Sequence, residues 1–100
     1  MEYRIGHSHD IHRLVPNRKL ILGGIEISHE RGLQGHSDAD VVLHVVAESI
    51  LGALGLGDLG THFPDTSEEF LNITSSKIVE KVVVMMQQRK YYINNMDITV

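Results

Sequence analysis

The sequence predicts an α+β or α/β fold in the order β-β-α-α-β, in which helices pack on one face of a mixed sheet. Three observations support this fold class. Apolar and polar residues alternate near both ends of the chain, apolar residues recur at helical spacing in two central segments, and stretches rich in Gly, Pro and Asp separate them. Residues 1–100 are expected to form a single domain. Because the last predicted strand runs to Val100 without a turn, we expect the C-terminal part of this domain to be missing from the chain.

Two strands are expected in the first third of the chain. Residues 2–12 alternate as a strand does, although both faces mix polar and apolar side chains. Residues 20–27 read LILGGIEI, where Gly23 and Gly24 indicate a bulge or a bend in a second strand. The segment 28–35 is expected to be a loop.

Two helices and a final strand are expected in the rest of the chain. The first helix is predicted from Ser37, which can cap its first turn, to about Ala53. The second helix is predicted over 75–89, and residues 91–100 alternate as a strand. Between the helices, GLGDLGTHFPDTS reads as a loop that is long enough to be functional. The apolar stripes are Leu43, Ala47, Ile50, Leu51 and Leu54 on the first helix and Ile78, Val82 and Met86 on the second.

The composition excludes several classes of function. The formal charge is −4, which gives no electrostatic reason to expect nucleic acid or an anionic membrane as a partner. No apolar run approaches the roughly 18 residues of a membrane span, so a soluble protein is expected. The chain has no Cys, so a transition-metal site would have to use Asp, Glu or some of the seven His.

A metal-binding constellation is predicted from two spacings. Asp10 and His12 stand two apart in the first predicted strand, so their side chains share a face. Asp40, His44 and Glu48 recur at every fourth position of the first predicted helix and also share a face. If strand and helix meet, Asp10, His12 and His44 supply three protein ligands. Three ligands with one open position are typical of catalytic zinc.

Other interpretations of the same residues stay open. A metal with an open position can equally activate water, as in a metal-dependent phosphohydrolase. A non-catalytic structural zinc module would add a fourth ligand, such as Glu48 or His36. Ser37 is either a simple helix cap or a phosphate contact at the helix N-terminus, where free amides favour anions.

Three longer blocks resemble a known enzyme family. RIGHSHDIH, GLQGHSDADVVLH and LGALGLGDLGTHFPDTS resemble, in order and spacing, RIGHGxDxH, GLxxHSDGDVxLH and LGAxxLGDIGxxFPDTD of the 2-C-methyl-D-erythritol 2,4-cyclodiphosphate synthases. The blocks span residues 4–67, and NNMDITV is similar to a later strand of that family. The joined blocks are highly specific, and no single short motif carries the resemblance.

The resemblance implies roles for individual residues. Asp10, His12 and His44 match the zinc ligands, and His36 matches a residue that helps to stabilise the transition state. The chain departs from the family's pattern, without loss of a ligand, at Ser8, His9, Ala39, Glu48 and Ser67. The residues implied in substrate binding are Asp10, Ile11, His12, His36, Ser37, Asp58, Leu59, Gly60, Phe63, Pro64, Asp65, Thr66 and Ser67.

The resemblance also implies a reaction. The family converts 4-diphosphocytidyl-2-C-methyl-D-erythritol 2-phosphate to 2-C-methyl-D-erythritol 2,4-cyclodiphosphate with release of CMP, in the non-mevalonate (methylerythritol phosphate) route to isoprenoids. It is a phosphorus–oxygen lyase that uses zinc and a second divalent cation, Mg or Mn, and it forms a homotrimer with sites between subunits. The expected partners are the phosphorylated substrate and a cytidine nucleotide, in the bacterial cytoplasm or a plastid-type organelle. Part of the nucleotide pocket is expected in the portion of the family that follows Val100.

Overall fold

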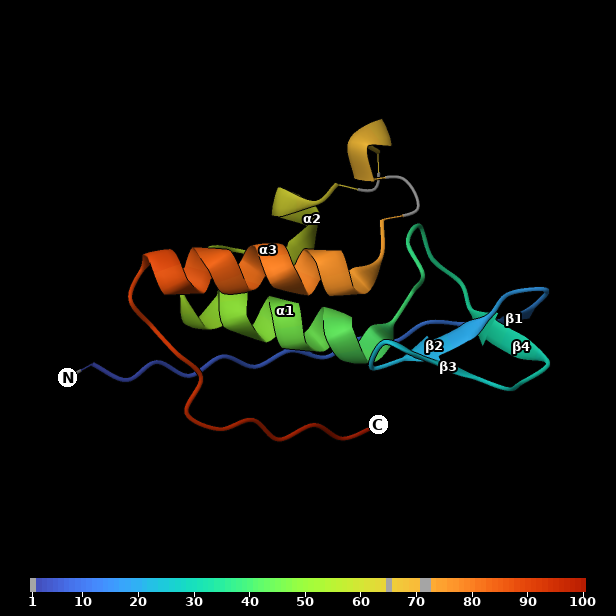
Figure 1. The fold of residues 1–100 in the computed structure, drawn as a ribbon, viewed down its shortest axis with the longest axis horizontal. Coiled ribbons are helices and arrows are strands. Elements are labelled where there is room, and N and C mark those ends of the chain that lie inside the picture. The colour runs from blue at the N-terminus through green and yellow to red at the C-terminus, as the bar shows by residue number, and fades with distance from the viewer. Residues whose placement is uncertain (1, 65, 71–72) are drawn as a thin grey trace.

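The computed structural model describes residues 2–64, 66–70 and 73–100, in which short strands precede the helices (Figure 1). This arrangement confirms the predicted α+β class. The strands are β1 (Leu14–Pro16), β2 (Leu20–Leu22), β3 (Ile25–Ile27) and β4 (Arg31–Leu33). The helical elements are α1 (Val41–Ala53), α2 (Leu59–His62), the 3₁₀ turn η1 (Glu68–Phe70) and α3 (Ser75–Gln88).

Within the described residues, the strands form two small antiparallel sheets at one end of the long helices (Figure 1). β1 pairs with β4, with Leu14 opposite Leu33, and β2 pairs with β3, with Leu20 opposite Ile27. β4 lies in the segment 28–35, which was expected to be a loop. The mixed sheet and the order β-β-α-α-β are not confirmed, since both observed pairings are antiparallel.

The single strand predicted over 20–27 is instead the β2–β3 hairpin. Gly23 has φ 64° and Gly24 has φ 81°, so both central residues of the turn adopt a left-handed conformation. Two such residues reverse the chain with a twist that matches the flanking strands, and glycine adopts this conformation without steric cost. The two glycines therefore mark a tight turn and neither a bulge nor a bend within one strand.

The strands predicted over 2–12 and 91–100 are not formed. Among the described residues, no backbone hydrogen bond joins 2–12 or 92–100 to a neighbouring strand. Alternation in a sequence indicates an extended segment, but a strand also needs a partner with which to form a ladder. Residues 2–12 instead run beside α1 (Figure 1), and a Cβ at Gly6 would lie 1.8 Å from the carbonyl oxygen of Ser49. This segment is therefore held close to a helix, with its backbone against that of α1.

The first long helix begins later than predicted. Ala39 has φ 57°, a left-handed conformation that ends any helix running through it from Ser37. Asp40 is therefore the N-cap, and its carboxylate accepts a 3.1 Å hydrogen bond from the Leu43 amide. Ser37 is not the helix cap, and the helix starts at Val41.

Asp40 also joins α1 to the β2–β3 hairpin. Its side chain is fully buried, and its carboxylate oxygens accept hydrogen bonds from the amides of Gly23 at 2.9 Å and Gly24 at 2.6 Å. A buried carboxylate is costly unless it is paired or hydrogen-bonded. The amides of the hairpin turn and of the first helical turn meet this requirement together.

The core lies between α1 and α3, as the two apolar stripes predict. Its buried members are Ala47, Ile50, Leu51, Ile78, Val82 and Met86. Complete burial of a side chain such as Leu51 or Val82 contributes about 1.5–3 kcal/mol. α3 ends one residue before the predicted Arg89, and the short helix α2 lies inside the expected loop. In the described part of the chain, no helix has the length and hydrophobicity of a membrane span.

Candidate metal centre and adjoining pocket

Three potential metal ligands converge where the N-terminal segment meets α1. One ligand atom from each of Asp10, His12 and His44 lies within 4.8 Å of the others. Asp10 Oδ2 is 3.1 Å from His12 Nε2 and 3.4 Å from His44 Nδ1. The side chains of Asp10, His12 and His44 are 25%, 20% and 15% exposed, so the cluster is largely buried but remains partly accessible to solvent. The structure thus brings together the set that the two sequence spacings predict.

The surroundings of His12 direct one of its ring nitrogens toward this cluster. Its Nδ1 lies 2.5 Å from the carbonyl oxygen of Gln34, which can only accept a hydrogen bond. The proton of a neutral ring therefore resides on Nδ1, and the lone pair of Nε2 faces Asp10. A backbone carbonyl commonly orients metal-binding histidines in this way.

The donor set fits zinc with an open coordination position. Imidazole nitrogen and carboxylate oxygen are both zinc ligands, and catalytic sites use three protein ligands where closed structural sites use four. Among the described residues, the converging group contains neither Glu48 nor His36, the two candidates for a fourth ligand. The geometry therefore favours an open site over a structural zinc module.

A pocket of about 290 Å³ adjoins the three ligands. His36, Ser37 and residues from α1, α2 and α3 line it together with the ligands. His36 Nε2 is buried there without a hydrogen-bond partner in the described structure. A buried polar atom without a partner is costly, and His36 is the pocket-lining residue that carries such an atom among the described residues. The lining residues are Asp10, His12, His36, Ser37, His44, Glu48, Leu59, Gly60, Phe63, Phe70, Ile73 and Ile78.

The loop predicted to bind substrate lies only partly along this pocket. Leu59, Gly60 and Phe63 line it, whereas Asp65 lies outside the described residues. Ile11 does not line it and is 82% exposed. Other members of the predicted substrate set that do not line the pocket are Asp58, Pro64, Thr66 and Ser67.

Asp58 has a structural role at the start of α2. Its Oδ1 accepts hydrogen bonds from the Thr61 backbone amide at 2.9 Å and from the Thr61 hydroxyl at 2.8 Å. These bonds, that of the hydroxyl foremost, lower the pKa of Asp58 because they favour its charged form. The carboxylate is thus the N-cap of the short helix that carries Leu59 and Gly60.

A family model described as the YgbB family matches residues 3–100 of this sequence. The chain belongs to the YgbB family.

Curated relatives of this YgbB-family chain share a name. A protein of Thiobacillus denitrificans is 50% identical over 99 residues, and one of Clostridium botulinum is 55% identical over 94 residues. Both are named 2-C-methyl-D-erythritol 2,4-cyclodiphosphate synthase. The alignments cover 99% and 94% of this chain, but 62% and 60% of the relatives. The chain therefore spans about three fifths of the length of these relatives.

Solved structures of similar proteins have the same fold. A 2C-methyl-D-erythritol-2,4-cyclodiphosphate synthase matches with a TM-score of 0.82 and 37% identity, over 87% of this chain and 58% of that one. A structure described as the CDP-bound form of such a synthase matches with a TM-score of 0.81 and 36% identity, over the same shares. A CDP complex from Plasmodium falciparum matches with a TM-score of 0.74 and 34% identity, over 92% of this chain and 55% of that one.

Sequence reasoning did not find every pocket residue of this YgbB-family chain. Phe70 and Ile73 have no motif of their own, and Phe70 lies edge-to-face against Phe63 with 5.3 Å between the ring centres. Glu48, a candidate fourth ligand in the sequence, lines the pocket beside the ligands and outside their converging group. Its two oxygens accept hydrogen bonds from the Leu59 amide at 3.3 Å and the Ser8 hydroxyl at 2.9 Å. Glu48 thus helps to position α2, and both of its oxygens already have protein partners.

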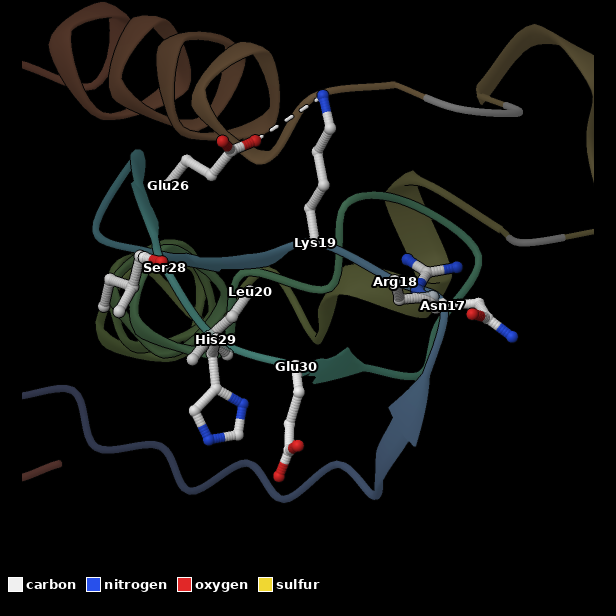
Figure 2. Close-up of a pocket in the computed structure, with 9 residues that line it drawn as sticks. Asn17, Arg18, Lys19, Leu20, Glu26, Ser28, His29 and Glu30 are labelled. Carbon is white, nitrogen blue, oxygen red and sulfur yellow. Dashed lines mark ion pairs between the residues drawn. The ribbon is translucent and has the colours of Figure 1, made fainter.

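A second hollow, of about 440 Å³, lies along the β2–β3 hairpin and the residues that flank it (Figure 2). Lys19 Nζ is 3.5 Å from Glu26 Oε1 across it, and the two side chains are 78% and 60% exposed. An ion pair this exposed contributes little to stability. None of the predicted site residues that the structure describes lines this hollow, which leaves the pocket beside the three ligands as the candidate functional site.

Proposed function

We propose that this protein acts as a 2-C-methyl-D-erythritol 2,4-cyclodiphosphate synthase. The observation that carries the proposal is the convergence of Asp10, His12 and His44 beside a pocket that His36 also lines. Membership of the YgbB family, and relatives that bear this enzyme's name, support the choice of reaction over other uses of a three-ligand site.

The proposed reaction is an intramolecular phosphoryl transfer of the phosphorus–oxygen lyase class. In 4-diphosphocytidyl-2-C-methyl-D-erythritol 2-phosphate, an oxygen of the 2-phosphate forms a bond to the β-phosphorus. The bond from that phosphorus to the oxygen it shares with the α-phosphorus breaks, and CMP leaves with the electron pair. The nucleophile is already an ionised phosphate, so little base catalysis is required. The protein has to fold the substrate back on itself and to neutralise charge.

Asp10, His12 and His44 would hold zinc at one end of the pocket. When bound, zinc supplies Lewis-acid polarisation of a phosphoryl oxygen and a local positive charge. A second divalent cation, Mg or Mn, is proposed to accompany the substrate's diphosphate. The formal charge of −4 supports both ions, since the chain without them would repel a multiply charged anion.

His36 is proposed as the residue that stabilises the transferring phosphoryl group. Its Nε2 is buried with no hydrogen-bond partner among the described residues and could donate a hydrogen bond to a phosphoryl oxygen as charge develops there. Ser37 lies beside it in the pocket, and Leu59, Gly60 and Phe63 form the wall proposed to hold the methylerythritol. The remaining members of the proposed substrate-binding set are Ile11, Asp58, Pro64, Asp65, Thr66 and Ser67.

We further propose a homotrimer with its sites between subunits. Large apolar side chains stand exposed on both terminal segments, including Ile5 at 93% and Tyr92 at 78%. Exposed apolar surface of this kind is typical of surfaces that another chain covers. The CDP named in two of the similar structures supports a cytidine nucleotide as the ligand of the completed site.

Phosphorus NMR of a reaction mixture tests the proposed activity. The purified protein, supplied with zinc and magnesium, is expected to convert the substrate to CMP and the cyclic diphosphate in equal amounts. The matched control is His36→Gln, which keeps a polar side chain and is expected to bind zinc while turning over more slowly. Release of CMP together with a linear bisphosphate would instead identify a phosphohydrolase and overturn the proposal.

A further inference from the structure

We propose that Asp38 and Ser75 are positioning residues that fix the tautomer of His44 and so prepare it as a metal ligand. This inference rests on the proposed zinc site and extends it beyond the three ligands. Asp38 lies in the loop before α1, His44 lies on α1, and Ser75 is the first residue of α3. The three residues are called the Asp38–Ser75–His44 network below.

The network is continuous and sheltered. Ser75 is fully buried, and its hydroxyl lies 2.8 Å from His44 Nε2. The same hydroxyl donates a hydrogen bond to Asp38 Oδ1. The Ser75 backbone amide donates to the other carboxylate oxygen of Asp38 at 3.0 Å. The hydroxyl and the backbone amide of Ser75 therefore both have hydrogen-bond partners, which are Asp38 and His44.

The direction of each hydrogen bond follows from the chemistry of the groups. An ionised carboxylate only accepts hydrogen bonds, so the single hydroxyl proton of Ser75 points to Asp38. The Ser75 oxygen is then an acceptor toward His44, 2.8 Å from Nε2, whereas Asp10 Oδ2 lies 3.4 Å from Nδ1. The shorter contact places the proton of the neutral imidazole on Nε2. A second hydroxyl oxygen, Ser37 Oγ, lies 3.3 Å from His44 Nε2. It also accepts a hydrogen bond from the Ala39 backbone amide.

This arrangement leaves the lone pair of His44 Nδ1 facing the other ligands. Nδ1 is 3.4 Å from Asp10 Oδ2, on the side of the ring opposite to Ser75. His12 is held by the reverse arrangement, with Nδ1 bonded to the Gln34 carbonyl and Nε2 toward Asp10. The two imidazoles thus present different nitrogens to one site, and each orientation is set by a separate partner.

The network also has a purely structural role that a test must separate from positioning. Thr74, the N-cap of α3, makes no side-chain capping bond, and Asp38 accepts the Ser75 amide in its place. Asp38→Asn keeps this capping, because the amide oxygen can still accept from the Ser75 amide. The new amide nitrogen would donate to the Ser75 hydroxyl, whose proton would then turn to His44 Nε2. We therefore expect Asp38→Asn to move the imidazole proton to Nδ1. The new nitrogen also replaces the oxygen that accepts the Asp40 amide at 3.1 Å, so this variant loses one hydrogen bond in the loop before α1.

Nitrogen-detected NMR of the histidine rings in the metal-free protein reads the tautomer directly, at a pH at which His44 is neutral. The wild-type protein is expected to carry the His44 proton on Nε2. Asp38→Asn is expected to carry it on Nδ1, and Ser75→Ala to show a mixture. The matched control is Ser76→Ala, which removes an exposed hydroxyl from the same helical turn and is expected to leave the ring unchanged.

Zinc affinity, measured by competition with a chelator, gives the second readout. Loss of an orienting partner weakens metal binding by about 10–100-fold, and we expect Asp38→Asn and Ser75→Ala to fall in this range while Ser76→Ala does not. Circular dichroism establishes that each variant is folded. If Ser75→Ala unfolds, the wild-type tautomer and Asp38→Asn still decide the question.

The outcomes separate this inference from the proposed function. A wild-type His44 with its proton on Nδ1 would overturn the network, as would wild-type zinc affinity in both variants. A wild-type protein that binds no zinc would overturn the claim that the network prepares His44 as a metal ligand. A zinc-bound protein with the expected tautomer that makes no cyclic product would leave the network supported and count against the synthase activity alone.

Discussion

The amide of Gly24 donates a 2.6 Å hydrogen bond to the buried carboxylate of Asp40, so the turn of a hairpin and the start of a helix share one anion. The same carboxylate accepts from the Leu43 amide in the first turn of α1. The position of α1, and with it the position of His44, therefore depends on the hairpin as well as on the helix itself.

Asp40→Ala is expected to destabilise the fold strongly. The substitution removes an N-cap and leaves the amides of Gly23 and Gly24 without their acceptor, which together cost about 2–4 kcal/mol. Urea denaturation followed by circular dichroism measures the loss. The matched control is Asp58→Ala, which removes an exposed N-cap from the short helix α2 and should cost less. Equal losses from the two variants would contradict the role assigned to burial.

His44→Ala is expected to remove bound zinc and activity while helical content stays largely intact. His44 supplies one of the three ligands, and the helix that carries it is held by apolar contacts on its other face. Metal analysis of the purified variant measures the first effect and circular dichroism the second. His29→Ala, which alters an exposed histidine that is not in the ligand group, is the control. A full equivalent of zinc in His44→Ala would refute the ligand assignment.

Removal of zinc is expected to lower the melting temperature of the wild-type protein. Free zinc at about 100 times its Kd stabilises a folded protein by about 2.7 kcal/mol. For a chain of this size, that energy corresponds to a shift of about 10–20 °C. Differential scanning calorimetry with and without a chelator measures the shift. The expected shift is absent in His44→Ala, and a similar shift in that variant would mean that zinc binds elsewhere.

The cap of α2 is expected to fail in acid. The hydrogen bonds from Thr61 lower the pKa of Asp58 below its ordinary value of 3.8. A carboxyl group whose pKa is lowered by folding stabilises the folded state above its unfolded pKa, and this contribution disappears as the pH falls through the lower, folded value. Carbon-13 NMR of the Asp58 carboxyl group should therefore show a midpoint below 3.8.

Thr61→Val separates the two bonds that Asp58 accepts. It removes the hydroxyl donor but keeps the backbone amide, so the midpoint of the Asp58 titration should rise part of the way toward 3.8. Thr66→Val alters an exposed threonine elsewhere in the same loop and should leave the midpoint unchanged. An unchanged midpoint in Thr61→Val would contradict the Thr61 hydroxyl as the main cause of the lowered pKa of Asp58.

The sequence predicted the local features of the fold better than the features that depend on distant partners. The α1 and α3 stripes follow from apolar spacing within one segment, and both helices form nearly as predicted. The extended segments 2–12 and 91–100 were mistaken for strands because alternation does not reveal whether a partner is present. The start of α1 was misplaced because the left-handed conformation of Ala39 leaves no mark in the sequence.

The same distinction applies to the candidate site. The Asp10, His12 and His44 set could be predicted because Asp10 and His12 have a regular spacing in one segment and His44 has a regular spacing in another, and the family resemblance pointed to the same three residues. The contact between Asp38 and Ser75 joins positions 37 residues apart and could not be predicted from either segment alone. The roles of the remaining substrate-binding residues stay predictions.

The close approach at Gly6 has a consequence for the spacing of the ion site. The backbone that leads to Asp10 and His12 rests against the carbonyl of Ser49, which lies five residues after His44 on α1, with no room for even one more carbon atom. Gly6, which has no side-chain carbon, thus sets how closely the segment 2–12 approaches α1. Through this approach it sets the distance between the ligands on the segment and the ligand on the helix. A methyl group at position 6 would push Asp10 and His12 away from His44, although none of the three ligands had been altered.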